Sequence, residues 1–317
     1  MTTAQHAIPT ISDIRAAAAR IARDVRRTPV HPWDEDGGIL LKLESLQPTG
    51  SFKVRGASNH VRDAVGKVQG VITASSGNHG QAVAYIASRL GMPAVVVVPE
   101  TVTPLKAAGI VRYGAELIRC GTTAAERYAL AERLAAERGL HLVPSFDDPL
   151  VVAGQGTCGL EILEQCPDLA AVVVPASGGG LLSGIALAVK ALRPEVRVVG
   201  AEPRTVARFA ASRAAGARVS VPSVATVADG LRVQQPGALT WEITRRCVDE
   251  FVAVDDESTL NAVRRLYLDA HLVVEPSGAV PVAALLAGSV AVRPALAVVS
   301  GGNLDPDLLS TLLSRAS

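Results

Sequence analysis

The most regular feature of the chain is an alternation of short apolar runs with longer segments in which apolar residues recur every three or four positions. The short runs predict buried strands, and the longer segments predict amphipathic helices. We expect strands at residues 39–43, 71–74, 94–98, 116–119, 172–174, 196–201 and 296–299. We expect helices at residues 11–25, 81–90, 104–113, 124–138, 181–192, 260–271 and 280–286. This order predicts an α/β fold in which parallel strands are covered by helices on both faces.

The strands fall into two series, which predict two lobes. Residues 70–140 are expected to form a smaller, mobile lobe, and residues 1–69 and 141–317 a larger one. Ser12 is a candidate cap for the first helix, and Gly139 is expected to close the helix that ends the smaller lobe. Open parallel sheets bind ligands at the carboxyl ends of their strands, so the loops that follow strands are the places to look for chemistry.

Composition narrows the class of protein. With 49% hydrophobic residues, 19% charged residues and a formal net charge of +1, the 317-residue chain can bury a large core but offers no charged surface for nucleic acid. No apolar run reaches the ~18 residues of a transmembrane helix, and residues 1–14 lack the apolar stretch of a signal peptide. The four cysteines have neither C-x-x-C nor metal-ligand spacing. We therefore expect a cytoplasmic protein with a small-molecule partner and with no nucleic-acid or membrane partner.

One lysine stands out by its setting. Lys53 lies in the segment Ser51–Gly56, beside Phe52 and directly after a turn built on Pro48 and Gly50. Most lysines are solvated, so one interpretation is an exposed basic residue at the start of a helix. The other interpretation is a partly desolvated amine that forms a Schiff base with a carbonyl cofactor. These six residues alone leave both interpretations open.

Two loops between a strand and a helix combine small and polar residues. In Ser75–Gly80, backbone amides at a helix N-terminus would favour a carboxylate or phosphate, and Ser, Asn and His side chains add donors. A plain turn with a capping side chain is the alternative. In Ser177–Gly184, three successive glycines let the backbone approach a ligand closely, and the helix dipole favours an anion.

A dinucleotide-binding unit is another interpretation of the second loop. Glu202 ends the next strand, near the position ~20 residues on at which such units carry an acidic residue. Ser183, however, stands where the motif G-x-G-x-x-G needs its third glycine, which makes this interpretation weak. A third loop, Ser300–Asn303, follows the last predicted strand, and its hydroxyl group could face a ring atom of a ligand.

Taken together, these motifs resemble the fold-type II pyridoxal-phosphate enzymes, and among them the threonine/serine dehydratase and serine racemase family. The resemblance extends over nearly the whole chain, with several motifs in the order and spacing of the family. The motifs are Pro48–Ala57, Ser76–Gln81, Asp147–Pro149, Ala153–Thr157, Ala228–Gly230 and Ser300–Asn303. The resemblance implies a two-lobed α/β fold in which each lobe is a mostly parallel twisted sheet flanked by helices. It also implies pyridoxal 5'-phosphate as the cofactor, bound by the larger lobe, and a homodimer.

The resemblance also implies roles for individual residues. Lys53 would bind the cofactor as a Schiff base and move the α-proton of the substrate, Asn78 would contact the phenolic oxygen, and Ser300 would face the pyridine nitrogen. The residues implied to bind the cofactor are Phe52, Lys53, Asn78, Ser177, Gly178, Gly179, Gly180, Leu181 and Ser300. Those implied to bind the substrate are Ser75, Ser76, Gly77, His79 and Arg127, with Lys53 and Ser76 as the catalytic residues.

The implied reaction is conversion of L-serine or L-threonine to a 2-oxo acid and ammonia, by abstraction of the α-proton and β-elimination of the hydroxyl group. Ser76 and Arg127 instead resemble serine racemases and 3-hydroxyaspartate ammonia-lyases, whereas Phe146 resembles the dehydratases. Racemases hold a divalent ion in the region after the residue that corresponds to Glu202. Here Arg208 lies in that region, so no metal site is expected.

Two further alternatives belong to other functional classes. A β-replacement synthase on the same fold is one, although Ser51–Lys53 and Asp147–Pro149 look more like the dehydratases. A non-catalytic nucleotide-binding protein is the other, and Lys53 together with the interrupted glycine motif argues against it.

Overall fold

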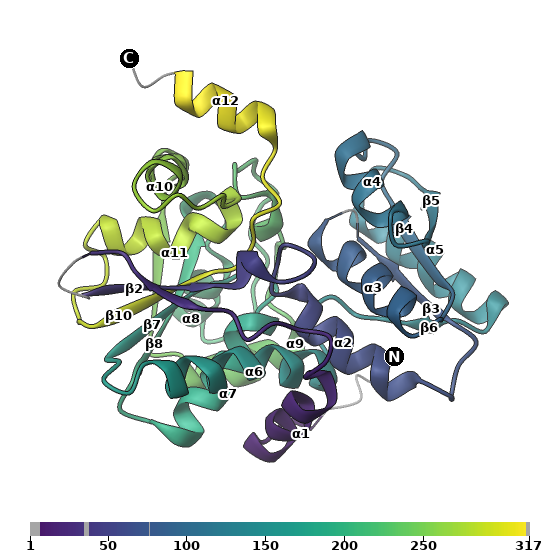
Figure 1. Ribbon diagram of the computed structural model, residues 1–317, viewed down its shortest axis with the longest axis horizontal. Coiled ribbons are helices and arrows are strands. Elements are labelled where there is room, and N and C mark those ends of the chain that lie inside the picture. Colours follow the sequence, from purple (N-terminus) through teal and green to yellow (C-terminus); the bar gives the residue numbers. More distant parts are fainter. Residues whose placement is uncertain (1–6, 35–37, 76, 315–317) are drawn as a thin grey trace.

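The computed structural model describes residues 7–34, 38–75 and 77–314, which form two sheets flanked by helices (Figure 1). The larger sheet has six strands in the order β1-β2-β10-β7-β8-β9, and the smaller sheet has four in the order β5-β4-β3-β6. The strands are β1 (Val30–Pro32), β2 (Ile39–Leu43), β3 (Val71–Ala74), β4 (Ala94–Val98), β5 (Glu116–Arg119), β6 (His141–Leu142), β7 (Ala171–Pro175), β8 (Arg197–Pro203), β9 (Glu250–Val254) and β10 (Ala295–Val299). Only β1 and β2 pair antiparallel among these strands, which confirms the predicted α/β fold.

Helices separate and cover the two sheets. They are α1 (Ile11–Ile21), α2 (Lys53–Ala64), α3 (Asn78–Arg89), α4 (Pro104–Val111), α5 (Ala124–Arg138), α6 (Pro149–Gln165), α7 (Gly180–Leu192), α8 (Arg208–Ala215), α9 (Ala238–Cys247), α10 (Asp256–Leu268), α11 (Pro276–Leu286) and α12 (Pro306–Ser314). The short 3-10 helices are η1 (Glu44–Leu46), η2 (Arg204–Val206) and η3 (Asp229–Leu231). In Figure 1 the smaller sheet and its helices stand to one side of the larger sheet, and α2 lies between them, packed on α3 and α6.

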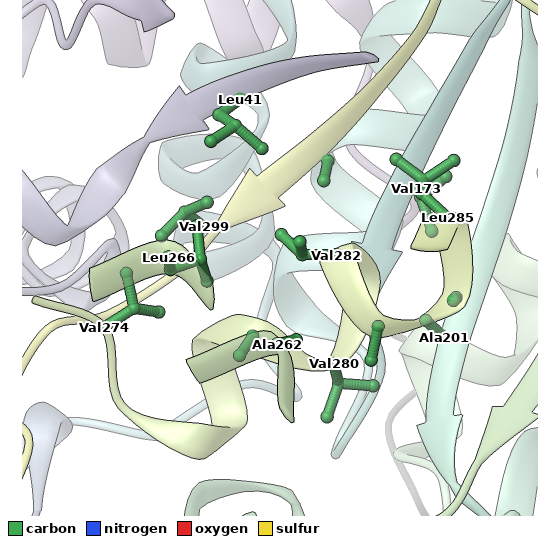
Figure 2. Packing of buried hydrophobic residues seen from close by; sticks show 14 of the residues in the cluster. Leu41, Val173, Ala201, Ala262, Leu266, Val274, Val280, Val282, Leu285 and Val299 are labelled. Carbon is green, nitrogen blue, oxygen red and sulfur yellow. The ribbon is translucent and has the colours of Figure 1, made fainter. Parts of the chain in front are cut away.

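The apolar runs became strands because both faces of each sheet are buried. Along β7, Val173 faces one core cluster, formed with α10 and α11, whereas Val172 and Val174 face another, formed with α6, α7 and α9. Figure 2 shows the first of these clusters, where Leu41 and Val299 from neighbouring strands lie with the side chains of α11. A continuous run of β-branched residues fills both faces at once, as expected for a parallel sheet.

Several element boundaries differ from the sequence-based expectation, and the clearest are at α1 and at the edge of the smaller sheet. Thr10, and not Ser12, caps α1, because its hydroxyl accepts from the Asp13 N–H at 3.3 Å while the Asp13 carboxylate accepts from the Thr10 N–H at 2.7 Å. The same helix ends at Ile21, four residues before the expected Val25. Other helices also shift, since α10 spans Asp256–Leu268 and not residues 260–271, and α11 begins at Pro276 and not at residue 280. The smaller sheet continues past residue 140, since β6 pairs with β3. The division of the chain into lobes at residues 69 and 140 stays a prediction.

The sequence pattern missed α6, which spans 17 residues and contains three glycines that disfavour a helix locally. Each of these glycines allows a neighbouring helix to come close. A side chain at Gly154 would collide with the backbone of α2 at Arg55, and one at Gly159 would collide with Ala188 of α7. Tight packing on α6 therefore fixes α2, which begins with Lys53, and α7, which follows the glycine loop Ser177–Gly180.

A buried charge network ties α2 to the larger sheet. The Arg55 guanidinium, fully buried, pairs with Glu44 and with Glu161 at 2.7 Å each. Lys42, on β2, pairs with Glu161 at 2.6 Å. Breaking such a network by removing one partner typically costs about 3–5 kcal/mol of stability, because the remaining charge is left buried without compensation. The network thus holds the N-terminal half of α2, where Lys53 lies.

Candidate active site

Lys53 is placed by contacts between its own turn and the last strand of the larger sheet. The Phe52 N–H donates to the Ser300 carbonyl at 3.0 Å, and Ser51 forms an isolated bridge with Gly301. Lys53 is then the first residue of α2. The lysine motif and the loop after β10, far apart in the sequence, therefore meet at the carboxyl end of the larger sheet.

The Lys53 amine is desolvated. Burial lowers the pKa of Lys53 to about 8. Its Nζ donates to the Ser145 carbonyl at 2.8 Å and lies 5.3 Å from the centre of the Phe52 ring. A lysine in this setting has an appreciable neutral fraction near pH 7–8, which is the form that attacks a carbonyl carbon or accepts a proton.

The glycine loop between β7 and α7 forms a cradle for an anion. Gly179 has φ of 99°, which is the left-handed region that favours glycine, and a Cβ at Gly178 would overlap the Phe146 ring. No side chain caps α7, so its first backbone N–H groups are free for a ligand. The Ser177 Oγ is buried and has no hydrogen-bond partner among the described residues. These donors suit a phosphate group.

The cradle is supported from behind by helix α9. Thr240 Oγ1 donates to the Gly178 carbonyl at 2.7 Å. Asp147 in turn accepts from the N–H groups of Ala238 and Thr240, at 2.7 and 3.1 Å, and so caps α9. The Asp147–Pro149 motif is thus accounted for, because the next residue, Asp148, caps α6 in the same way.

The loop between β3 and α3 is the second site element, and Ser76 within it lies outside the described residues. Gly77 precedes α3, whose start is capped by no side chain of the described residues, and Ser75 and Gly77 are half-buried. The His79 ring turns into the core, where its Nε2 lies 3.1 Å from the Val143 carbonyl. Burial, followed by the nearby Lys53 charge, lowers the pKa of His79 to about 3. The imidazole is therefore neutral, and its Nε2–H donates to the Val143 carbonyl in the core and not toward a ligand.

Asn78, on a helix beside the smaller sheet, contacts two residues beside the larger sheet. Its Nδ2 donates to Glu275 Oε1 at 2.6 Å, and its Oδ1 accepts from Asn303 Nδ2 at 2.6 Å. These partners lie at the start of α11 and in the loop after β10. The sequence analysis did not single out Glu275 or Asn303 as site residues.

The comparisons with known proteins agree with this geometry. A family model described as pyridoxal-phosphate dependent enzyme matches residues 21–301. The chain is 44% identical to an L-threonine ammonia-lyase of Geobacter sulfurreducens, over 95% of this chain and 77% of that protein. It is 40% identical to a serine racemase of Oryza sativa subsp. indica, over 94% of this chain and 92% of that protein. The solved structure of maize serine racemase matches with a TM-score of 0.92 at 38% identity and covers 98% of both chains.

The chain belongs to the pyridoxal-phosphate-dependent enzymes. Within them it is a member of the threonine dehydratase and serine racemase family. The implied cofactor is therefore confirmed as pyridoxal 5'-phosphate. The residues fit that group: the glycine cradle and the unpartnered Ser177 hydroxyl suit its phosphate, and the desolvated Lys53 amine suits its aldehyde.

Two residues that suggested other functions have structural partners in this enzyme. The Glu202 carboxylate accepts from the N–H groups of Phe209 and Ala210 at 3.0 Å each and so caps α8, which leaves it unavailable to a ribose. Arg208 is fully buried, and its guanidinium donates to the carbonyls of Ala176, Val206 and Leu231. Among the described residues, no group of three or more His, Cys, Asp and Glu side chains could hold a metal ion.

Arg127 lies on the second turn of α5, where it is partly exposed. Its guanidinium donates to the Thr122 carbonyl at 3.4 Å, just before its own helix. The next residue, Tyr128, places its hydroxyl 3.2 Å from the Ser145 Oγ, beside the carbonyl that binds Lys53.

In the described residues no helix is long and apolar enough to cross a membrane.

Proposed function

We propose that this enzyme is an ammonia-lyase that converts L-threonine or L-serine to a 2-oxo acid and ammonia. The observation that carries the proposal is the Lys53 amine, whose pKa of about 8 suits a proton acceptor at neutral pH. The titratable side chain of the opposite loop, His79, is instead bonded to Val143 in the core. Among the described residues, proton transfer is therefore supported on the lysine side, while Ser76, the candidate for the other side, lies outside them. The 44% identity to an L-threonine ammonia-lyase supports elimination as the first candidate.

The roles of the residues follow from their positions. Bound pyridoxal phosphate supplies the electron sink that makes the α-hydrogen of an amino acid acidic. The free amides at the start of α7 and the Ser177 hydroxyl hold the phosphate, and the free amides at the start of α3 hold the substrate carboxylate. Lys53 takes the α-proton, the β-hydroxyl leaves as water after receiving a proton, and hydrolysis of the product imine releases ammonia. Threonine thus yields 2-oxobutyrate, and serine yields pyruvate.

The test is a visible absorption spectrum of the purified protein before and after addition of L-threonine or L-serine, with 2-oxo acid followed in the same sample. We expect the wild-type protein to be yellow and to form the 2-oxo acid. The Lys53→Ala variant should lack the wild-type absorption band and should form no 2-oxo acid. A yellow wild-type protein that forms no 2-oxo acid from either amino acid would reject the ammonia-lyase. The ratio of kcat/KM for the two amino acids then ranks them as substrates.

A serine racemase or a 3-hydroxyaspartate ammonia-lyase is the second candidate. The residue type at position 76, a serine, and the half-exposed Arg127 support it, as does the 40% identity to the rice serine racemase. Assays for D-serine and for oxaloacetate, run beside those for pyruvate and 2-oxobutyrate, separate these activities. Arg127→Met should lower only the hydroxyaspartate activity if Arg127 binds the extra carboxylate.

Two further parts of the proposal rest on analogy with relatives. A homodimer and a cytoplasmic location are expected for this enzyme, as for the metabolic enzymes it resembles. Light scattering of the holoenzyme measures the oligomeric state, and a molar mass near 32.8 kDa in place of twice that value would reject the homodimer.

A β-replacement activity is tested by sulfide with an activated serine, and we expect none.

A further inference from the structure

A buried carboxyl group beside Asn78 has no part in the roles described so far. Glu275 directly precedes α11 and is 7% exposed. Its Oε1 accepts a hydrogen bond of 2.6 Å from Asn78 Nδ2, and its backbone N–H donates to the Gly301 carbonyl at 3.1 Å. A carboxyl group removed from water costs free energy unless it is paired or protonated, so its presence at the meeting point of two lobes calls for a functional explanation.

The amide of Asn78 is held at both ends. Glu275 accepts from its nitrogen, and Asn303 Nδ2 donates to its oxygen at 2.6 Å. Asn303 is itself fixed, since the same nitrogen donates to the Thr49 carbonyl at 3.0 Å in the turn before Lys53. The two partners decide which end of the Asn78 amide is oxygen. They leave its second N–H as the donor that can meet a ligand.

The surroundings of Glu275 favour its neutral form. Burial, followed by the negative charge of Asp229, raises the pKa of Glu275 to about 8, against the opposing effects of the Asn78 hydrogen bond and the Lys106 charge. At pH 7 the group is therefore mainly a carboxylic acid. In that form it still accepts from Asn78, and it adds no negative charge beside a ligand that is itself an anion.

We propose that Glu275 is a positioning residue for the cofactor: as a neutral acid, and together with Asn303, it orients the Asn78 amide so that its free N–H meets the phenolic oxygen of pyridoxal phosphate. Glu275 acts through Asn78 and is not itself a catalytic residue. The inference rests on the proposed contact between Asn78 and the cofactor, and it is independent of which amino acid the enzyme consumes.

The first test titrates the apoenzyme with pyridoxal 5'-phosphate and measures its Kd and the visible absorption band, with no amino acid present. Glu275→Gln keeps a neutral acceptor for Asn78, so its Kd at pH 7 should stay within about threefold of the wild type. Glu275→Ala removes the acceptor, and its Kd should rise about tenfold, the effect of one lost hydrogen bond. The melting temperature of each apoenzyme checks folding, and Glu242→Gln, an exposed carboxyl on α9, is the control. A Kd unchanged in Glu275→Ala would overturn the proposal.

A double variant tests whether Glu275 acts through Asn78. Asn78→Ala should weaken cofactor binding and shift the absorption band. Adding Glu275→Ala to it should then change Kd by less than about threefold, because the residue that Glu275 orients is already gone. A further tenfold loss in the double variant would show an independent role and reject the proposal, as would an Asn78→Ala variant with wild-type Kd and absorption band.

A pH series tests the charge state. As pH rises from 7 to 9, Glu275 ionises beside the anionic cofactor, so wild-type affinity for the cofactor should fall relative to that of Glu275→Gln. The fall should be up to about tenfold for each unit by which the bound cofactor raises the pKa of Glu275. Lys53, Asp229 and Lys106 are present in both proteins, so the ratio of the two Kd values isolates Glu275. A ratio that stays constant with pH would reject the neutral acid as the working form. None of these readouts uses an amino acid, so they stand even if the ammonia-lyase assay fails.

Discussion

Two loops with similar sequences differ in how the protein supports them. Ser177–Leu181 and Ser75–Gly80 each follow a parallel strand and lead into a helix that has no side-chain cap. The first loop is packed closely, with the Phe146 ring against Gly178 and the Thr240 side chain behind it. The second is open at Gly77, where an added Cβ would meet no atom within 4 Å.

Contacts between elements of the two sheets hold Asn78 at the end of the second loop and recur nearby. Asn78 is held by Glu275 and Asn303, and Lys106 on α4 pairs with Asp229 of η3 at 2.5 Å. The glycine loop is thus held by elements around the larger sheet, whereas Asn78 is held by contacts between elements of the two sheets. We therefore expect a cofactor end that is preorganised and a substrate end that depends on how the two sheets meet. The predictions below test that contrast.

The largest effect is expected at Lys53, which we propose acts on both the cofactor and the substrate. Lys53→Ala removes the group that we propose binds the cofactor covalently and takes the α-proton, so kcat should fall at least about 10³-fold. The helix α2 should persist, because alanine is a good helix former and the Arg55 network remains. Circular dichroism and the 2-oxo acid assay measure the two expectations. Residual activity within tenfold of the wild type would exclude Lys53 as the base.

A matched pair of alanine substitutions tests the two loops directly. Gly178→Ala forces a methyl group into the Phe146 ring, so the Kd for pyridoxal 5'-phosphate should rise about 100-fold and the melting temperature should fall. Gly77→Ala finds open space, so Kd should stay within about threefold while the KM for the amino acid rises. Cofactor titration and steady-state kinetics separate the two. Equal losses of cofactor affinity in both variants would contradict the contrast between the loops.

The sequence was sufficient for the central strands, because these are short apolar runs buried on both faces. It missed β1, β6 and β9, which lie at the edges of the two sheets and are mostly partly exposed. β2 and β4 match their predicted bounds. Helix starts were less predictable, since α3 begins at Asn78 and not at Gln81, with glycine and polar residues in its first turn. The glycines of α6 disfavour a helix locally and are compensated only by the helices that pack on them.

The site was predictable where a local motif makes a local structure. The glycine loop is such a case, with the positive φ of Gly179. Glu275 was not, because its partner Asn78 lies 197 positions away and nothing near Glu275 in the sequence indicates the contact. For His79 a signal was present: it shares the buried face of α3 with Val83 and Ile86, at helical spacing, which points its ring inward.

The buried His79 side chain should make the fold sensitive to acid. His79 is neutral when folded, with a pKa of about 3, but becomes protonated in the unfolded chain below its ordinary value of about 6.5. Stability is therefore fully present above pH 6.5 and is lost as pH falls, by up to about 2 kcal/mol between pH 6.5 and 5. Thermal melts at pH 7 and pH 5 measure this loss, and it should be smaller in His79→Gln, whose amide can still donate to Val143. An equal loss in both proteins would assign the acid sensitivity to other groups.

The smallest effect is expected at the edge of the contact between the lobes. Lys106 and Asp229 are both partly exposed, so their ion pair contributes less than about 1 kcal/mol and is weakened by salt. Lys106→Met should raise the KM for the amino acid by about two- to fourfold at low ionic strength, leave the Kd for pyridoxal 5'-phosphate unchanged, and lose its effect near 0.5 M salt. The matched control is Lys67→Met, which removes the exposed ion pair of Lys67 with Asp63, a residue of α2 four positions earlier. If Lys106→Met instead weakened cofactor binding as much as substrate binding, the cofactor end would also depend on closure, and the larger lobe could not be regarded as preorganised by itself.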